Sequence, residues 1–264
     1  MRVSVLLSVV DCVMGMTQLH DVIYIVCQRS STILCYSITR LEQLTDIYVK
    51  GLSEPQDIAA CELTSQLYIS DGGGEKYIWR VSSDGEDIRC WGTRSDIFIP
   101  WTLSVTSSRL LVTSLDTSEL MQLSAGGDEL QRVHLPRYMY PLHHAVESPT
   151  GTFIVSYRNK ELNDRYQVSE VNTEDDVLCR FSSSSLGMPQ HIAVDSQGNI
   201  FVADCDSHRI LLLDAQLALR RVIIDERQLN DMWPRRLCYI ENLGQLMVGF
   251  YDSGIVAVFD VLYH

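Results

Sequence analysis

The stretch PQHIAVDSQGNIFVAD, residues 189–204, contains two short apolar runs separated by a Ser-Gln-Gly turn. We predict one strand over residues 190–195 and a second over 199–204, because β-branched and aromatic residues bounded by turn residues are typical of strands. Two further apolar runs follow at 208–213 and 219–224. Four short strands joined by turns predict a four-stranded antiparallel sheet.

The proline that opens this stretch recurs along the chain. It precedes a short apolar run at Pro55, Pro100, Pro141, Pro189 and Pro234, with spacings of 45, 41, 48 and 45 residues. A repeat of this length, with several strands in each unit, is typical of a β-propeller. The residues before Pro55 show the same runs without the proline. We therefore predict six blades, at about residues 12–50, 55–92, 100–135, 141–182, 189–226 and 234–264.

The last unit has only three strands. The apolar segment from Arg2 to Leu7 can supply the fourth. Pairing the two ends of the chain would close the ring and remove an exposed sheet edge. The predicted fold class is therefore all-β: one six-bladed propeller over residues 1–264, built from four-stranded antiparallel blades and closed by the N-terminal strand.

Charge and cysteine usage limit the partners and the compartment. The net charge of −13 repels phosphate, so we expect no DNA partner and consider RNA possible but disfavoured. No apolar run approaches the roughly 18 residues that span a membrane, so we expect no membrane partner. The eight cysteines are at least eight residues apart, so no Cys-x-x-Cys zinc motif occurs. Free thiols in apolar runs favour a cytoplasmic protein, and a secreted protein with buried disulfides is the alternative.

Residues 189–204, followed by Ser-His-Arg-Ile at 207–210, resemble an NHL repeat. The second unit resembles it too, whereas the third, fourth and sixth units lack its aspartate. Asp71 and Asp204 are expected to bond to turn amides. The resemblance implies a six-bladed propeller similar to the C-terminal NHL domain of tripartite-motif proteins. It thereby implies protein recognition, as in the substrate-receptor part of a ubiquitin ligase, or RNA binding.

The alternating direction of side chains along the first strand of each unit predicts a binding site. Side chains four residues after each proline are small, so we expect positions +4 and +2 to face the channel. Position +2 gives a ring at one channel mouth, and +1 gives its neighbours. The ring is Met14, Asp57, Thr102, His143, His191 and Arg236, and the neighbours are Trp101, Gln190 and Arg235. We interpret the ring as a cationic or titratable arc for an acidic or polar partner group. Solvated rim residues without a ligand are the alternative.

The same ring argues against an enzyme. Calcium takes six to eight oxygen ligands, and the ring offers only Asp57. Catalytic zinc usually has three protein ligands, and the ring offers His143 and His191. His144 directly follows His143, so we expect it to point to the opposite face. We therefore expect no catalytic residue, no metal and no cofactor. Protein recognition is the favoured function, RNA binding is the alternative, and a metal-dependent lyase or lactonase is the second alternative.

Overall fold

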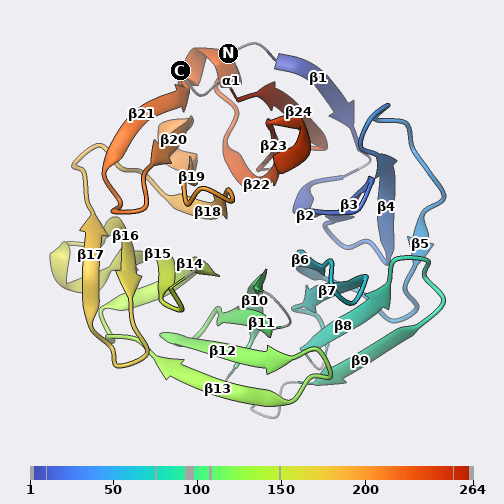
Figure 1. Ribbon diagram of the computed structural model, residues 1–264, viewed down its shortest axis with the longest axis horizontal. Helices are drawn as coiled ribbons and strands as arrows, with labels where there is room; N and C mark the ends of the chain where they lie inside the picture. Colours follow the sequence, from blue (N-terminus) through green and yellow to red (C-terminus); the bar gives the residue numbers. More distant parts are fainter. Residues whose placement is uncertain are drawn as a thin grey trace.

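The computed structural model describes residues 3–9, 11–74, 76–92, 98–106, 109–148, 150–251 and 253–261. These residues form six four-stranded sheets, arranged as blades around a central axis (Figure 1). Every pairing within a blade is antiparallel, as in β2 with β3 or β18 with β19. The predicted all-β, six-bladed propeller is therefore confirmed.

Each blade runs from an innermost strand near the axis to an outermost strand at the rim. The inner strands are β2 (Val13–Leu19), β6 (Pro55–Cys61), β10 (Pro100–Thr106), β14 (Met139–Glu147), β18 (Pro189–Val194) and β22 (Pro234–Ile240). The middle strands are β3 (Val22–Cys27), β4 (Thr32–Ser37), β7 (Gln66–Asp71), β8 (Tyr77–Ser82), β11 (Arg109–Ser114), β12 (Glu119–Ser124), β15 (Phe153–Asn159), β16 (Arg165–Val171), β19 (Ile200–Asp204), β20 (Arg209–Leu213), β23 (Gln245–Phe250) and β24 (Ile255–Asp260). The outer strands are β5 (Ile47–Tyr48), β9 (Ile88–Gly92), β13 (Glu129–His134), β17 (Val177–Phe181), β21 (Leu219–Ile224) and β1 (Val3–Ser8).

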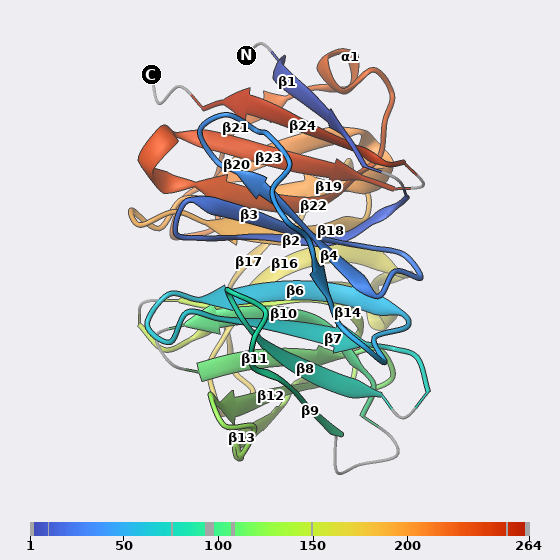
Figure 2. The same ribbon diagram turned by 90° about the vertical axis from the view of Figure 1, so that its right-hand side faces the viewer.

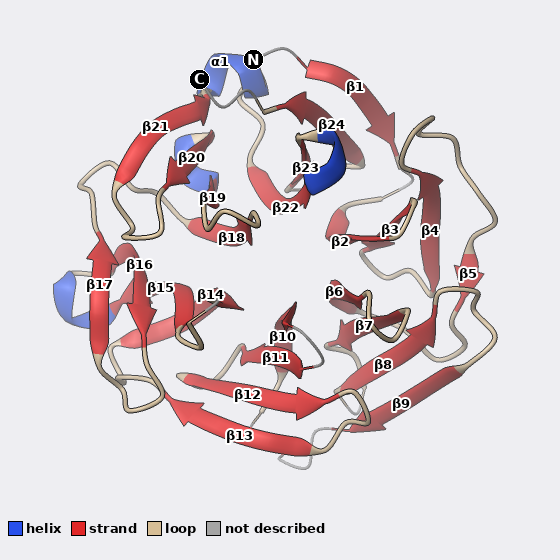
Figure 3. Ribbon diagram, viewed as in Figure 1, coloured by secondary structure: helices blue, strands red, loops and turns tan. Residues whose placement is uncertain are grey.

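The N-terminal strand closes the ring as predicted. β1 pairs antiparallel with β24, and Leu7 lies opposite Val256. The sixth blade therefore has the strand order β1-β24-β23-β22, with its outer strand taken from the other end of the sequence (Figure 3). Arg2, where we placed the start of this strand, lies outside the described residues.

Six apolar clusters lie between consecutive blades and hold them together. Ile58 of β6 belongs to the cluster shared with the first blade, and its neighbour Ala59 belongs to the cluster shared with the third. Alternate residues of an inner strand thus face the preceding and the following blade. The expectation that position +4 lines an open channel is wrong at Ala59 and Cys238, which are buried between blades.

Two aspartates were predicted to bond to turn amides, and they do bond to backbone amides, mainly in the loop that leads into the inner strand. Asp71 accepts hydrogen bonds from the backbone amides of Ser53, Glu54 and Gly73, at 2.9–3.1 Å. Asp204 in the fifth blade accepts one from the amide of Gly187 at 2.7 Å. These bonds hold the inner strand's start at the face that we call the proline face, where all six inner strands begin. Figure 2 shows the ring from its edge.

None of the eight cysteines forms a disulfide, and six of them are buried. In the described part of the chain, helical structure is limited to α1 (Glu226–Leu229) and three single 3₁₀ turns, at Lys160–Leu162, Cys205–Ser207 and Glu241–Leu243. Within the described ranges, no helix has the length and apolar character needed to cross a membrane.

Candidate functional site

The inner strands bring one side chain from each blade to the same level near the axis. In the second blade, Pro55 lies opposite Asp71 and Asp57 lies opposite Ser70. The fifth blade has the same offset, which places His191 at the level of Asp57. Strand pairing in the third and sixth blades places Thr102 and Arg236 there as well. Four of the six predicted ring positions are therefore correct in level.

The other two positions are displaced by one residue. In the fourth blade Leu142 takes the place that proline holds elsewhere, so His144 reaches the axis in place of His143. In the first blade Gly15 does so in place of Met14. Counting from Pro141 fails because β14 has an additional shift in its pairing, between Met139 and Leu142, ahead of the shift that the other inner strands share. We call the observed set the axial ring: Gly15, Asp57, Thr102, His144, His191 and Arg236.

Side chains of the axial ring hydrogen-bond to the backbone of the following blade. Buried polar atoms are costly without such partners, so each bond stabilises one blade junction. The bonds, in blade order, run from Leu103 N to Asp57 Oδ2 (2.9 Å), from Thr102 Oγ1 to His143 O (3.1 Å), from Ile192 N to His144 Nδ1 (3.2 Å), from Leu237 N to His191 Nδ1 (3.4 Å) and from Arg236 Nε to Met14 O.

Arg236 also crosses the axis to the second blade. Its Nη2 donates to the Gln56 carbonyl at 3.0 Å, and its Nε lies 3.6 Å from Asp57 Oδ1. Both side chains of this ion pair are 1% exposed. Burial lowers the pKa of Arg236 to about 10 and raises that of Asp57 to about 6, and in each case the partner's charge opposes the shift. Arg236 therefore remains cationic at neutral pH.

His144 and His191 stack, with ring centroids 3.8 Å apart and an angle of 25° between planes. Burial lowers the pKa of both, that of His144 to about 3. Because His144 Nδ1 accepts a backbone N–H, the ring proton belongs on Nε2, which lies 3.4 Å from the Leu103 carbonyl oxygen. The expectation that His144 faces away from the axis is wrong.

This correction brings together a set of atoms that resembles a metal site. Possible ligand atoms of Asp57, His144 and His191 lie within 4.8 Å of one another, and two histidines with a carboxylate suit a transition metal. Both oxygens of Asp57, however, already accept backbone amide hydrogens, and so does His144 Nδ1. A cation there would break blade junctions and lie beside the Arg236 guanidinium. The Asp57 oxygens and His144 Nδ1 are better explained as hydrogen-bond acceptors for backbone amides than as metal ligands.

His143 packs outside the axial ring. It is buried, its ring centroid lies 5.7 Å from that of Tyr166, and its Nε2 has no hydrogen-bond partner within the described chain. Burial is the main cause that lowers its pKa to about 4, and the positive charge of Arg158 is the second cause. The predicted arc of His143, His191 and Arg236 therefore carries charge at neutral pH only on Arg236.

A cavity of about 320 Å³ lies at the proline-face mouth of the channel. We call it the mouth pocket, and its lining residues are Met14, Gln28, Arg29, Glu54, Pro55, Gln56, Trp101, Arg235 and Tyr251. Trp101 and Arg235 are predicted site residues that the structure brings together here. Gln190, also predicted, is half-buried and does not line this pocket.

Arg235 is the charged side chain most enclosed by the mouth pocket. It is 8% exposed, its guanidinium carbon lies 5.0 Å from the Tyr251 ring centroid, and its Nη1 lies 3.7 Å from Cys12 Sγ. No described carboxylate comes within ion-pair distance of it. Tyr251 was missed because it follows a second strand, far from any proline used for alignment.

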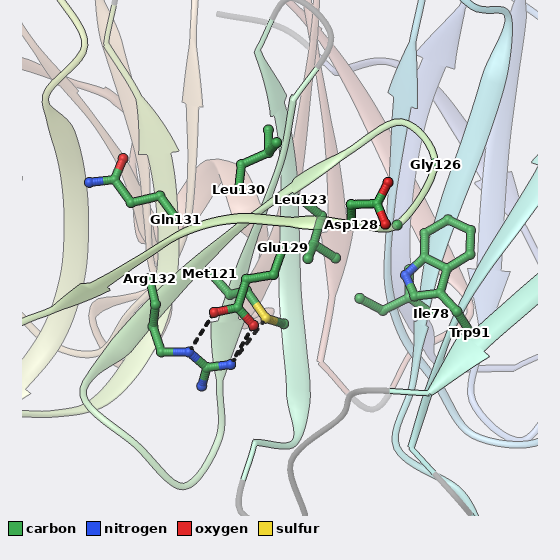
Figure 4. Close-up of a pocket in the computed structure, with 11 residues that line it drawn as sticks. Ile78, Trp91, Met121, Leu123, Gly126, Asp128, Glu129, Leu130, Gln131 and Arg132 are labelled. Atoms are coloured by element: carbon green, nitrogen blue, oxygen red, sulfur yellow. Dashed lines mark hydrogen bonds and ion pairs between the residues drawn. The ribbon is translucent and has the colours of Figure 1, made fainter.

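A larger cavity, of about 580 Å³, lies at the rim between the second and third blades (Figure 4). Trp91, Met121 and Arg132 are among its lining residues. Arg132 pairs there with Glu129 at 2.8 Å and with Glu119 at 3.0 Å. Its charge is thus neutralised within the protein, whereas Arg235 has no such partner among the described residues. The mouth pocket is therefore the stronger candidate for recognising a charged group.

Residues 186–211 match the model of the NHL repeat. No match was found among curated proteins. Similar solved structures include hydrazine synthase from Kuenenia stuttgartiensis, with a TM-score of 0.71 and 13% identity over 96% of this chain and 84% of that chain.

Two further structures have the same fold. Virginiamycin B lyase from Staphylococcus aureus gives a TM-score of 0.69 and 9% identity, over 98% of this chain and 99% of that chain. The WD40 β-propeller domain of Doa1 gives 0.67 and 15%, over 98% and 96%. Identities this low show a shared fold alone. The chain is therefore a six-bladed β-propeller whose fifth blade carries an NHL repeat.

Proposed function

We propose that this propeller is a non-catalytic module that recognises a protein partner at the proline face through the mouth pocket. The observation that carries the proposal is the meeting of Trp101, Arg235 and Tyr251 in one open pocket. Tryptophan, tyrosine and arginine are the residues that most often dominate the energy of protein interfaces.

The axial ring supports a binding role over catalysis. A catalytic base or metal ligand needs a free lone pair. The lone pair of His144 Nδ1 instead accepts a backbone amide hydrogen, and Asp57 accepts two such hydrogens and is paired with Arg236. Folds shared with a lyase and with a WD40 domain do not favour either role, because one propeller fold serves many functions.

We further propose that the module acts as a substrate receptor, as the resemblance to the NHL domain of tripartite-motif proteins implies, and that it works in the cytoplasm. The NHL repeat at residues 186–211 supports the first proposal. The eight cysteines, none of which forms a disulfide, support the second, because disulfides are rare in that compartment.

A site-specific photo-crosslink tests the proposed face. A photoreactive residue replaces Gln28, which is exposed and lines the mouth pocket, and a matched control replaces Tyr48, which is 64% exposed on the outer strand β5. We expect a discrete protein adduct from position 28 only. An excess of propeller without the photoreactive residue should prevent formation of this adduct. The same excess of a Trp101→Ala, Tyr251→Ala double variant should leave the adduct unchanged.

Two results would overturn the proposal. Equal labelling from positions 28 and 48 would place recognition elsewhere or nowhere. An adduct that disappears on ribonuclease treatment would replace protein recognition with RNA binding, which the net charge of −13 disfavours.

A further inference from the structure

Arg235 is a buried cation with no described carboxylate partner, in a chain that has 34 acidic residues. Burying a charge is costly unless it is paired, and lysine and arginine are rarely buried without an acidic partner. Among the described residues, the guanidinium contacts only weak acceptors, namely the Tyr251 ring and the Cys12 sulfur. Its strongest hydrogen-bonding capacity is therefore left for a group beyond the described residues.

The charges around the pocket indicate what that group is. The lining contains two arginines, Arg29 and Arg235, and one carboxylate, Glu54, which leaves one positive charge. Arg236 beneath it is already paired with Asp57. One positive charge balances a singly charged carboxylate, whereas a phosphate dianion would leave surplus negative charge beside Glu54. A carboxylate is the better match.

The geometry of the pocket suits an acidic side chain. Tyr251 holds the Arg235 guanidinium from one side, which orders its planar fork for a bidentate carboxylate. Trp101 supplies an apolar wall for the carbon atoms of the same side chain. A volume of about 320 Å³ is at the small end of ligand pockets and fits one or two residues of a partner.

We infer that the mouth pocket binds a single carboxylate of a partner peptide through Arg235, between Trp101 and Tyr251. The carboxylate belongs to an aspartate or glutamate side chain or to the partner's C-terminus. This inference rests on the proposed protein recognition, and it adds the chemical group that is recognised.

Selection from a random peptide library tests it, in two arms with amidated and with free C-termini. Peptides are selected on the wild-type propeller and counter-selected on Arg235→Gln. We expect acidic residues at one fixed position in the amidated arm if the ligand is a side chain, and enrichment confined to the free arm if it is a C-terminus. For an acidic binder, a Glu→Gln change should weaken affinity about tenfold or more.

A double-mutant cycle assigns the effect to Arg235. In Arg235→Gln, the acidic peptide and its glutamine analogue should bind equally, whereas Arg40→Gln, at an exposed position, should keep the wild-type preference. If Arg235→Gln does not fold, Arg235→Lys serves instead. Lysine keeps the charge but loses the planar fork, so it should reduce the preference.

The outcomes separate the two proposals. Binders without an acidic residue, or an unchanged preference in Arg235→Gln or Arg235→Lys, would overturn the carboxylate inference and leave protein recognition standing. Failure to enrich any peptide while the position 28 adduct forms would also count against the carboxylate inference. Absence of both binders and adduct would overturn the inference and the proposed function together.

Discussion

His143 and His144 are consecutive in sequence, but only His144 reaches the axis, where it stacks on His191 with ring centroids 3.8 Å apart. His143 packs near Tyr166, and its Nε2 is unpartnered within the described chain. Two adjacent histidines thus have different structural roles, and substitution can tell them apart.

Replacing each with phenylalanine should give different stabilities. His144→Phe leaves the buried amide of Ile192 without its acceptor, which should reduce the free energy of unfolding by about 1–3 kcal/mol. His143→Phe keeps an aromatic ring beside Tyr166 and removes an unpartnered nitrogen, so it should change stability by less than about 1 kcal/mol. Urea unfolding at pH 7.5 measures both. Equal losses would contradict the assigned roles.

Stability should fall as pH drops below about 6.5, the unfolded-state value for histidine. Burial lowers the folded-state pKa of His143 to about 4 and of His144 to about 3, and that of His191 also falls well below 6.5. The unfolded chain therefore binds protons that the folded chain excludes. Each histidine contributes a slope of about 1.4 kcal/mol per pH unit.

Asp57 opposes this slope. Its folded-state pKa is raised to about 6, so the folded chain takes up one proton in the same range before the unfolded chain does. The net slope should therefore correspond to about two protons near pH 5. Unfolding curves at several pH values between 7.5 and 5 measure it. A free energy of unfolding that stays flat or rises as the pH falls over this range would contradict the lowered histidine pKa values.

Arg236→Met should be strongly destabilising. It removes the bonds to the carbonyls of Met14 and Gln56 and leaves Asp57 buried without its counter-charge. Breaking a buried ion pair from one side typically costs about 3–5 kcal/mol. Arg40→Met is the matched control, because Arg40 is 76% exposed and should change stability by less than about 0.5 kcal/mol. Similar thermal unfolding of the two variants would argue against a central role for Arg236.

Asp71→Ala should destabilise the loop that leads into β6, the inner strand of the second blade. The carboxylate accepts from three backbone amides and from Trp79 Nε1 at 3.1 Å, so its loss leaves several donors unsatisfied. We expect a loss of about 2–4 kcal/mol. Asp116→Ala, at an exposed position of the third blade, should be nearly neutral. Amide hydrogen exchange of Ser53, Glu54 and Gly73 should accelerate in Asp71→Ala alone.

The propeller could be predicted because the sequence features that indicate it, the prolines and the apolar runs, repeat along the chain. Proline spacing gave the blade count, and the three-stranded last unit pointed to the closing strand β1. The role of Asp71 followed from its place directly after a second strand. Each of these inferences tolerates an error of one residue along the chain.

The axial ring did not tolerate such an error. One residue of displacement reverses the direction of a strand side chain, so counting from Pro141 selected His143 in place of His144. A signal was present, because the spacings on either side of Pro141, 41 and 48 residues, are the shortest and the longest of the series. The mouth pocket was harder to predict, since Arg29 and Tyr251 come from loops of different blades and meet only in the closed ring.

The closing strand has a consequence for folding during synthesis. β1 is synthesised before the other described strands of the propeller and its partner β24 after them, so their pairing has the greatest sequence separation of the described strand pairs. Contacts of this kind form late, because they carry the largest loop-closure entropy. Until then, Leu7 lacks the part of its apolar cluster that β24 supplies, namely Val256 and Val258. Two nascent chains held close together could therefore exchange their first strands, and the ring would close between molecules.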